Sequence, residues 1–512
     1  MERQEENSYR NILKRISAFG GVQMFNVVIG LVRGKFVALF LGADGMGIST
    51  LYNSSTATIQ QICSLGLNLA VVKEVAASKD DPRRLRHTLR VGLRLLLLTC
   101  LLGALVCGAM APLWSRWTFG DGRETVSYLW LSLFVALSIA GAGYLALLQG
   151  LGEVKRLSKA SLVGGLAGLL FGVPLYYLFG TAGIVPAMII LALSTFLFYY
   201  FNFKAAERGE AVRGDAAAEE EAETATAAPD TRGLVGRLVS LGFILLIGAL
   251  AGTLTNYLIN MFIRYAGSVE DVGLFQAANS ITNQYVGMVF SALALDYFPR
   301  LSAICHDSEK MHEVVNRQTE IVILVAAPLI IALILTAPLL IRLLLTQQFM
   351  VVIPLINWLG FGTLIQAIAF PLGYIYVARE DRKVFLWLEC VWGNVCWLLC
   401  SVVFYYWQGL DGLGMSLVAR GVIDLIINYM LCKRRYGFRY SGRAWKSVGV
   451  ALVLTGGAFG VATCGGGRLM IAAEAAQFGG AGGGLCFCFF YQYQFLVFFM
   501  SVKFSGVCSP PR

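Results

Sequence analysis

Long apolar runs dominate the chain and are separated by short polar segments. About twenty consecutive apolar residues cross the hydrocarbon core of a bilayer as an α-helix. By that criterion the pattern predicts about fourteen transmembrane helices. Their predicted ranges are 16–40, 46–72, 91–113, 125–149, 159–179, 181–203, 239–264, 272–298, 318–345, 351–378, 384–407, 411–432, 446–464 and 468–500. The runs are too long for barrel strands and lack alternation, so we expect an all-α polytopic membrane protein.

Three of the predicted spans carry many hydrogen-bonding side chains, as in "MGISTLYNSSTATIQQI" at 46–62. Spacings of three and four place these side chains on one face of each helix. The faces comprise Asn53, Thr56, Gln60 and Ser64 in the second span, Asn256, Asn260 and Arg264 in the seventh, and Gln276, Asn279 and Asn283 in the eighth. Amides are costly in lipid, so we expect these faces to contact protein or a water-filled cavity.

Composition supports a membrane protein, because 57% of the 512 residues are hydrophobic, 14% are charged and the mean hydropathy is +0.67. A soluble domain carries about 25% charged residues. The formal net charge of +10 raises the question of nucleic-acid binding. Most Lys and Arg residues, however, lie in the N-terminus and in the loops after even-numbered spans. The positive-inside rule then explains the charge without nucleic acid and predicts that both termini are cytoplasmic.

The segment 204–237 is rich in Ala and Glu and has too few large apolar residues to form a packed core. We interpret it as an acidic, flexible cytoplasmic linker. The predicted organisation is a six-helix half at 1–203, this linker, a second six-helix half at 238–435, and two additional helices at 436–512.

The two halves show a short internal similarity. "MGISTLYNSST" at 46–56 and "VGLFQAANSIT" at 272–282 align without a gap, with Gly273 lying 226 positions after Gly47. The two stretches also share the Asn53/Asn279 pair. Both open the second span of their half. Repeated halves are typical of transporters, whose substrate sites lie between them.

Ionisable residues at membrane depth are costly and mark functional positions. Arg33 and Lys35 lie near the outer end of the first span, and Arg420 lies one turn before Asp424 in the twelfth. A structural alternative for Arg420 and Asp424 is an ion pair that clasps helices. For Arg33, Lys35 and Arg264 the alternative is snorkelling to the interface. Together the four cations predict a basic cavity that suits an anionic, hydrogen-bonding ligand.

Sequence signatures of catalysis are missing. The three histidines lie in predicted loops, and the twelve cysteines show no metal-ligand or disulfide spacing, so we expect no metal site. No phosphate-binding glycine loop is followed by Lys-Ser/Thr. Every predicted outer loop is short, which argues against a membrane-embedded polymerase or ligase. We therefore expect neither an enzyme nor a cofactor.

Several stretches resemble flippases of O-antigen and capsule units, the Wzx-type proteins of the multidrug/oligosaccharidyl-lipid/polysaccharide (MOP) exporter superfamily. They are "FGGVQMFNVVIGLVRGKFVALFLGADGMGISTLYNS", "LALLQGLGEVKRLSKASLVGG", "VGLFQAANSITNQYVGMVFSALALDYFPRLSAI" and "GLDGLGMSLVARGVIDLIINYMLCKRRYGF". The resemblance covers about residues 10–450. The linker is longer and more acidic than the resemblance leads one to expect.

The resemblance implies a V-shaped bundle of two six-helix halves with two further helices, in the bacterial cytoplasmic (inner) membrane. It also implies that an undecaprenyl-pyrophosphate-linked oligosaccharide, an O-antigen or capsule repeat unit, moves to the periplasmic leaflet by alternating access. Membrane lipids and a polysaccharide polymerase are the implied partners in lipopolysaccharide biosynthesis. A lipid II flippase and a drug/cation antiporter of the MATE type remain alternatives.

Two further hypotheses concern mechanism. Bidentate geometry favours Arg33, Arg264 and Arg420 over Lys35 as pyrophosphate anchors. The membrane potential drives anions outward, and coupling of a proton or Na⁺ through Asp424 or Asp296 is the alternative. From about 457 the chain becomes rich in Gly, Cys and Phe. An altered reading frame near the end and an unusual last helix are both consistent with that composition.

Overall fold

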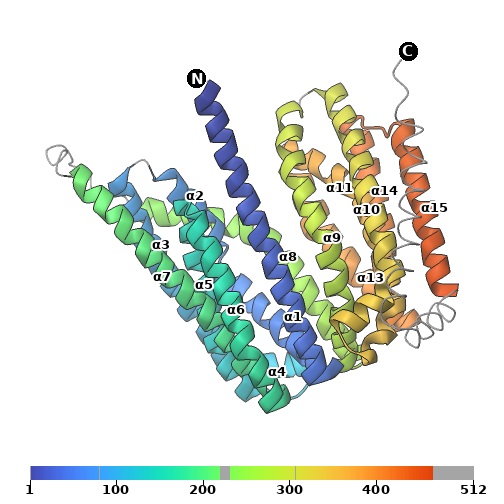
Figure 1. The fold of residues 1–512 in the computed structure, drawn as a ribbon, viewed down its shortest axis with the longest axis horizontal. Coiled ribbons are helices and arrows are strands. Elements are labelled where there is room, and N and C mark those ends of the chain that lie inside the picture. Colours follow the sequence, from blue (N-terminus) through green and yellow to red (C-terminus); the bar gives the residue numbers. More distant parts are fainter. Residues whose placement is uncertain (1, 80, 219–230, 306, 465–512) are drawn as a thin grey trace. The chain divides into compact units, whose positions relative to one another are not determined.

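The computed structural model describes residues 2–79, 81–218, 231–305 and 307–464, and all its regular elements in these ranges are helices (Figure 1). Ten helical stretches of the described residues are long and apolar enough to cross a membrane. One of these stretches, Arg156–Glu207, contains the predicted spans 159–179 and 181–203, and another, Phe25–Cys63, contains parts of the first two. The expectation of an all-α polytopic membrane protein is confirmed. The predicted span 468–500 lies outside the described residues.

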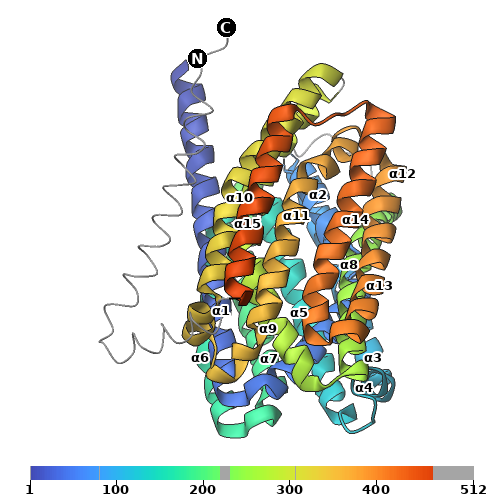
Figure 2. The ribbon, with the colours of Figure 1, turned by 90° about the vertical axis from the view of Figure 1, so that its right-hand side faces the viewer.

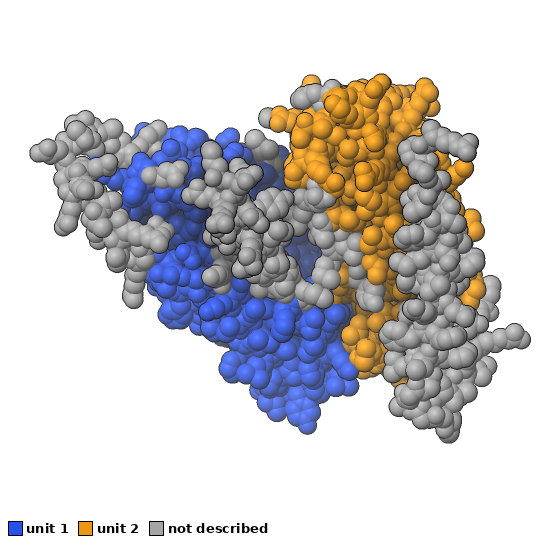
Figure 3. All heavy atoms as spheres, turned by 45° about the horizontal axis from the view of Figure 1, so that its top comes forward, with its two compact units in different colours: residues 1–273 blue, residues 274–512 orange. Residues whose placement is uncertain are grey.

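The chain forms two compact units, residues 1–273 and 274–512, which Figure 3 colours separately. The first contains α1 (Glu2–Cys63), α2 (Leu67–Ala77), α3 (Pro82–Ala109), α4 (Ala111–Phe119), α5 (Thr125–Leu151), α6 (Val154–Phe179), the 3₁₀-helix η1 (Gly180–Gly183), α7 (Ile184–Ala218), α8 (Thr231–Ala266) and the start of α9 (Val269–Ile304). Within this unit α8 packs against α1 and α2. The predicted organisation into two six-helix halves stays a prediction.

The first predicted span and most of the second lie in α1, which consists of two helical parts that meet at a kink at Gly42. Gly42 has φ 67° and ψ −163°, a backbone conformation that essentially only glycine adopts. The second span is interrupted again, because Leu65 and Gly66 have positive φ values and α2 starts at Leu67. A Cβ at Gly66 would lie 2.1 Å from the carbonyl oxygen of Gly242 in α8. Glycine therefore permits close contact between this break and α8.

The predicted linker is helical in part. Residues 204–218 continue α7, and 231–237 form the first turns of α8. The acidic stretch 219–230 lies outside the described residues, so its predicted flexibility stays a prediction.

The second unit contains the rest of α9, followed by α10 (Ser308–Leu344), the 3₁₀-helix η2 (Gln347–Val352), α11 (Ile353–Ala378), α12 (Arg382–Phe385), the π-helix η3 (Leu386–Trp392), α13 (Gly393–Gln408), α14 (Leu410–Tyr436) and α15 (Gly442–Cys464). In Figure 2, α11 runs between α14 and α15. The contacts of α11 with α10, α14 and α15 make it the central helix of this unit.

Each unit has its own apolar core. Leu147, Leu148 and Phe203 are buried in the first unit, and Ile330 and Tyr376 in the second. Other apolar side chains point outward at helical spacing. Leu97, Leu101 and Leu105 on α3, for example, are exposed by 62%, 59% and 66%. Such an apolar outer stripe is expected where a helix faces lipid.

Candidate functional site

The polar face on the second part of α1 is largely satisfied by its own helix. The Thr56 hydroxyl donates to the carbonyl of Tyr52 at 2.6 Å, and the amide Nδ2 of Asn53 donates to the carbonyl of Ser49 at 2.8 Å. Such bonds to the preceding turn make polar side chains tolerable in a membrane helix. Gln60 is half-buried, and its side chain forms no hydrogen bond within the described part of the chain. Its amide is therefore available to a ligand or to water.

A chain of buried hydroxyl groups joins four helices of the first unit. Ser55 of α1 lies 2.8 Å from the hydroxyl of Tyr128 in α5, and Tyr128 donates to Thr118 of α4 at 3.0 Å. The Thr118 hydroxyl lies 2.9 Å from that of Tyr257 in α8. Because each of these four hydroxyl groups has a hydrogen-bond partner, the network fixes α4 against α1, α5 and α8. Neither α4 nor this network was predicted from the sequence.

Glu124 is a second feature that the sequence analysis missed. The hydroxyls of Tyr52 and Ser127 donate to the same carboxylate oxygen of Glu124, at 2.5 and 2.7 Å. Glu124 immediately precedes α5, where a carboxylate is favoured by the positive end of the helix dipole. An acid directly before an apolar run is the signal that identifies such a residue from sequence.

The predicted stripe on α8 divides into different environments. Asn260 is completely buried, and neither its amide nitrogen nor its carbonyl oxygen has a partner among the described residues. Asn256 is half-buried one turn earlier. Arg264 lies in the last turn, 4.8 Å from the ring of Tyr265. Its guanidinium packs on Gly120, where an added Cβ would lie 2.4 Å from Nη1.

Arg264 therefore lies beside the C-terminal cap of α4, since Gly120 is that cap. A cation is favoured at this end of the helix dipole. Arg264 is thus placed at the edge of the stripe, whereas Asn260 is placed inside the unit.

Arg33 and Lys35 do not share one face of α1. Residues two positions apart on an α-helix point to nearly opposite sides. Arg33 is half-buried and Lys35 is exposed, and neither side chain forms an ion pair or a hydrogen bond with another described residue. At most one of the two can face a given cavity.

Polar side chains of α9 form hydrogen bonds to one another along the helix. Asn283 donates its amide to the Oδ1 of Asn279 at 2.8 Å, and Gln276 donates to the Ser280 hydroxyl at 3.4 Å. Gln276 and Asn279 are half-buried and Asn283 is exposed. Asp296 belongs to α9, but its side chain lies outside the described part of the structure.

The internal similarity has a structural counterpart where α9 begins. A Cβ at Gly47 would lie 2.0 Å from the carbonyl oxygen of Val269, and one at Gly273 would lie 2.0 Å from that of Ala43. Val269 follows Ala43 by 226 positions, the same offset that relates the two glycines. The contact is therefore reciprocal: each glycine meets the carbonyl four residues before the other. Such a pairing is expected from a local two-fold relation.

In the second unit the structure brings Arg420 and Asp424 together. Their side chains form an ion pair with 3.2 Å between Nε and Oδ2, and they are 23% and 19% exposed. The guanidinium also lies 5.1 Å from the ring of Trp397. Asn428 donates its amide to the Asp424 carbonyl at 2.9 Å, while its own carbonyl oxygen is buried without a partner in the described residues.

Glu389 adds a carboxylate to this group that the sequence analysis overlooked. It lies in the π-helix η3 and accepts a hydrogen bond from the buried hydroxyl of Tyr376. Asp424 is within electrostatic range of both Glu389 and Arg420. π-Helical turns are frequent at functional sites. An acid in the apolar run "FLWLECVW" was the available signal.

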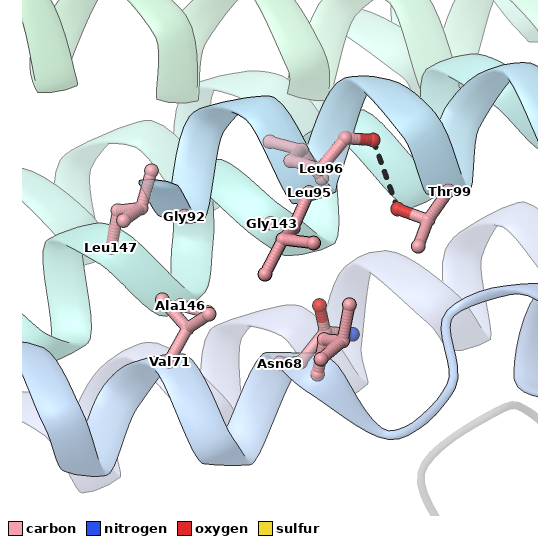
Figure 4. Close-up of a pocket in the computed structure, with 10 residues that line it drawn as sticks. Asn68, Val71, Gly92, Leu95, Leu96, Thr99, Gly143, Ala146 and Leu147 are labelled. Atoms are coloured by element: carbon pink, nitrogen blue, oxygen red, sulfur yellow. Dashed lines mark hydrogen bonds between the residues drawn. The ribbon is translucent and has the colours of Figure 1, made fainter. Parts of the chain in front are cut away.

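One small cavity lies inside the first unit, between α2, α3 and α5, and measures about 20 Å³ (Figure 4). The Asn68 side chain lies beside this space (Figure 4), and the Thr99 hydroxyl donates to the Leu96 carbonyl at 2.9 Å. Its other lining residues are apolar or glycine. A space of this size holds about one water molecule. It is therefore no substrate site, and no predicted site residue lines it.

The chain is similar to known proteins in sequence and in fold. A family of polysaccharide biosynthesis proteins matches residues 228–354. The lipid III flippase of Escherichia coli (strain K12) is 23% identical over 418 residues, which cover 79% of this chain and 92% of that protein. The lipid III flippase of Shigella flexneri matches equally well.

Two solved structures share the fold. An inward-facing multidrug resistance MATE family transporter of the MOP superfamily has a TM-score of 0.65 at 15% identity, covering 80% of this chain and 94% of its own. The lipid II flippase MurJ, in an inward closed conformation, has a TM-score of 0.62 at 13% identity, covering 96% and 99%. The chain thus has the fold of MOP superfamily transporters.

Proposed function

We propose that this protein is a flippase that moves a lipid-linked oligosaccharide across the cytoplasmic membrane by alternating access. The observation that carries the proposal is the similarity to the lipid III flippase, which extends over 79% of this chain and 92% of that protein. The match of residues 228–354 to polysaccharide biosynthesis proteins supports the same class of substrate. The proposed cargo is an undecaprenyl-pyrophosphate-linked O-antigen or capsule repeat unit.

Polar side chains replace the water that the sugars lose. A hydroxyl without a partner costs several kcal/mol, about 4–8 in an alkane-like medium. The half-buried amides of Asn53, Gln60 and Asn256 and the buried amide of Asn260 are suited to bind sugar hydroxyls. The amides of Gln276, Asn279 and Asn283 extend this set on α9.

Arginine side chains bind the pyrophosphate. A guanidinium donates two parallel hydrogen bonds to phosphate oxygens, which an ammonium group cannot do. Arg33 and Arg264 are half-buried and lack ion pairs among the described residues, which favours them for this role. Arg420 retains free donors because only its Nε bonds to Asp424. Lys35 contributes charge alone.

Two energy sources are compatible with these groups. An inside-negative potential moves each negative charge outward with about 2.3 kcal/mol per 100 mV. Alternatively, a proton or Na⁺ binds near Asp424, where Glu389 supplies a second carboxylate, or at Asp296 on α9. Both termini face the cytoplasm, and a polymerase receives the flipped unit at the other leaflet.

Mass spectrometry of lipid-linked intermediates in a deletion strain tests the proposal. We expect undecaprenyl-linked repeat units to accumulate and to disappear when the gene is restored on a plasmid. Accumulation of lipid II would instead assign the protein to cell-wall precursor export. Unchanged glycolipids together with increased drug sensitivity would contradict a flippase and favour a drug antiporter.

A further inference from the structure

A hollow of about 440 Å³ lies beside the last turn of α14, the helix that also carries Arg420 and Asp424. Its lining consists of Met430, Lys433, Arg434, Gly437 and Arg439. Gly437 has φ 69° and ends the helix, and residues 437–441 lead from there to α15 (Figure 2). Three of the five lining residues are cations, so the hollow is strongly basic.

The three cations are not neutralised within the protein. Lys433, Arg434 and Arg439 are exposed, and no carboxylate of the described residues lies within ion-pair distance of them. The neighbouring Arg435 differs, because it forms an ion pair with Asp381 at 2.9 Å. The turn thus uses one arginine internally and leaves three cations around the hollow, where their mutual repulsion favours a bound anion.

The segment that carries Arg439 is held in place. The amide of Asn316 donates to the Arg439 carbonyl at 3.1 Å, and the Ser441 backbone N–H donates to Asn316 Oδ1 at 2.8 Å. Tyr440 donates its hydroxyl to the Ile368 carbonyl of α11 at 3.2 Å, and Phe438 is fully buried. The backbone at Arg439 is therefore fixed before any ligand binds, which lowers the entropic cost of binding.

Aromatic residues indicate the depth of the hollow in the membrane. The ring of Tyr440 stacks on Tyr429 with 5.4 Å between centroids and lies 5.5 Å from the ring of Trp445. Trp and Tyr gather at the membrane–water interface. Met430, one turn before Arg434, is 54% exposed and gives the hollow an apolar side. Cations beside an apolar surface at this depth suit a lipid headgroup.

We propose that this hollow binds the phosphate group of a membrane lipid in the leaflet that the charge distribution predicts to be cytoplasmic. Arg434 and Arg439 offer planar donor pairs for phosphate oxygens, and Lys433 adds a point charge. Two kinds of lipid present this chemistry: an anionic phospholipid, and the polyprenyl diphosphate of the proposed cargo. The site is separate from the cavity residues of the proposed function and does not require that function.

Native mass spectrometry of the purified full chain tests the proposal. The protein is titrated with phosphatidylglycerol, phosphatidylcholine and undecaprenyl diphosphate. The test variant carries Lys433→Gln, Arg434→Gln and Arg439→Gln. The control variant carries Arg90→Gln, Lys159→Gln and Arg317→Gln, which remove the same charge from three other exposed positions on the predicted cytoplasmic side.

We expect the test variant to bind the ligand about tenfold more weakly than the wild type, because each cation adds to the attraction of an anionic headgroup. The control variant keeps wild-type affinity. Weakened binding of phosphatidylglycerol alone identifies a phospholipid site, and weakened binding of the diphosphate alone identifies a docking site for cargo.

The proposal is overturned if lipid affinity falls equally in the test and control variants, or if it falls in neither. The cations would then only complement the C-terminal dipole of α14. Melting temperatures of the variants establish that they are folded. If the test variant does not fold, the single Arg434→Gln variant is titrated instead, with inorganic pyrophosphate as a competitor of lipid on the wild type.

Discussion

At the residue scale, the sequence identified polar and charged positions but not their partners. The pairing of Arg420 with Asp424 follows from their spacing of four on one helix, and it was predicted as an alternative. Glu389 and Glu124 were missed because their partners, Tyr376 and Tyr52, lie on other helices. Contacts between helices depend on packing that periodicity along one helix does not encode.

Substitution of Arg420 separates binding from a structural role. We expect Arg420→Ala to abolish export in a complementation assay while expression stays normal, and Arg420→Lys to retain part of it, because lysine keeps the charge but loses the planar donor pair. In the Arg420→Ala/Asp424→Ala double variant no charge is left unpaired. If the pair is only a clasp, this variant recovers export, which would contradict a role in binding.

Asn260 offers a second test at this scale. Replacing it by leucine removes a buried amide whose lack of partners costs about 1–3 kcal/mol. We therefore expect Asn260→Leu to unfold at the same temperature as the wild type or a higher one, and yet to lose most of its transport. The two readouts are thermal unfolding of the purified protein and complementation. A clear drop in stability would indicate that the amide serves the fold instead of the cargo.

At the element scale, hydropathy predicted the spans well because lipid imposes one requirement, an apolar stretch of sufficient length. It did not predict the short helix α4 or the π-helix η3. These features depend on local backbone geometry and on neighbouring helices. The break at Leu65–Gly66 likewise follows from contact with Gly242, which lies far along the chain.

The reciprocal contact of Gly47 with Gly273 gives a prediction at this scale. A methyl group at either position would meet a backbone carbonyl, so we expect Gly47→Ala and Gly273→Ala each to destabilise the protein by about 1–3 kcal/mol. Gly34→Ala on the same helix α1 is the matched control, since nothing lies within 4 Å of an added Cβ there. Alanine favours that helix by up to about 1 kcal/mol.

Thermal unfolding of the three glycine variants provides the measurement. Unfolding midpoints that fall by similar amounts in Gly47→Ala and Gly273→Ala, with an unchanged or raised midpoint in Gly34→Ala, support the symmetric contact. Equal midpoints for all three variants would show that the backbones are not in close contact at this point.

At the scale of the whole molecule, the sequence predicted the fold class because repeated apolar spans and a resemblance to flippases point to the same architecture. The contacts of α8 with α1 and α2 depend on which helix faces are complementary, and hydropathy along the chain does not encode this. The division into halves at 203 and 238 stays a prediction. The repeat offset of 226, by contrast, relates residues that lie in contact.

The direction of transport depends on how the molecule is oriented in the membrane. The charge distribution predicts that the α4–α5 connection lies outside and the start of α10 inside. We expect a cysteine at Gly122 to react with an impermeant maleimide in intact spheroplasts, and a cysteine at Glu309 to react only after permeabilisation. Both positions are exposed. The unsubstituted protein controls for native cysteines, most of which are buried among those described. The opposite labelling pattern would show that the predicted orientation is reversed. The hollow at α14 would then bind a lipid of the outer leaflet.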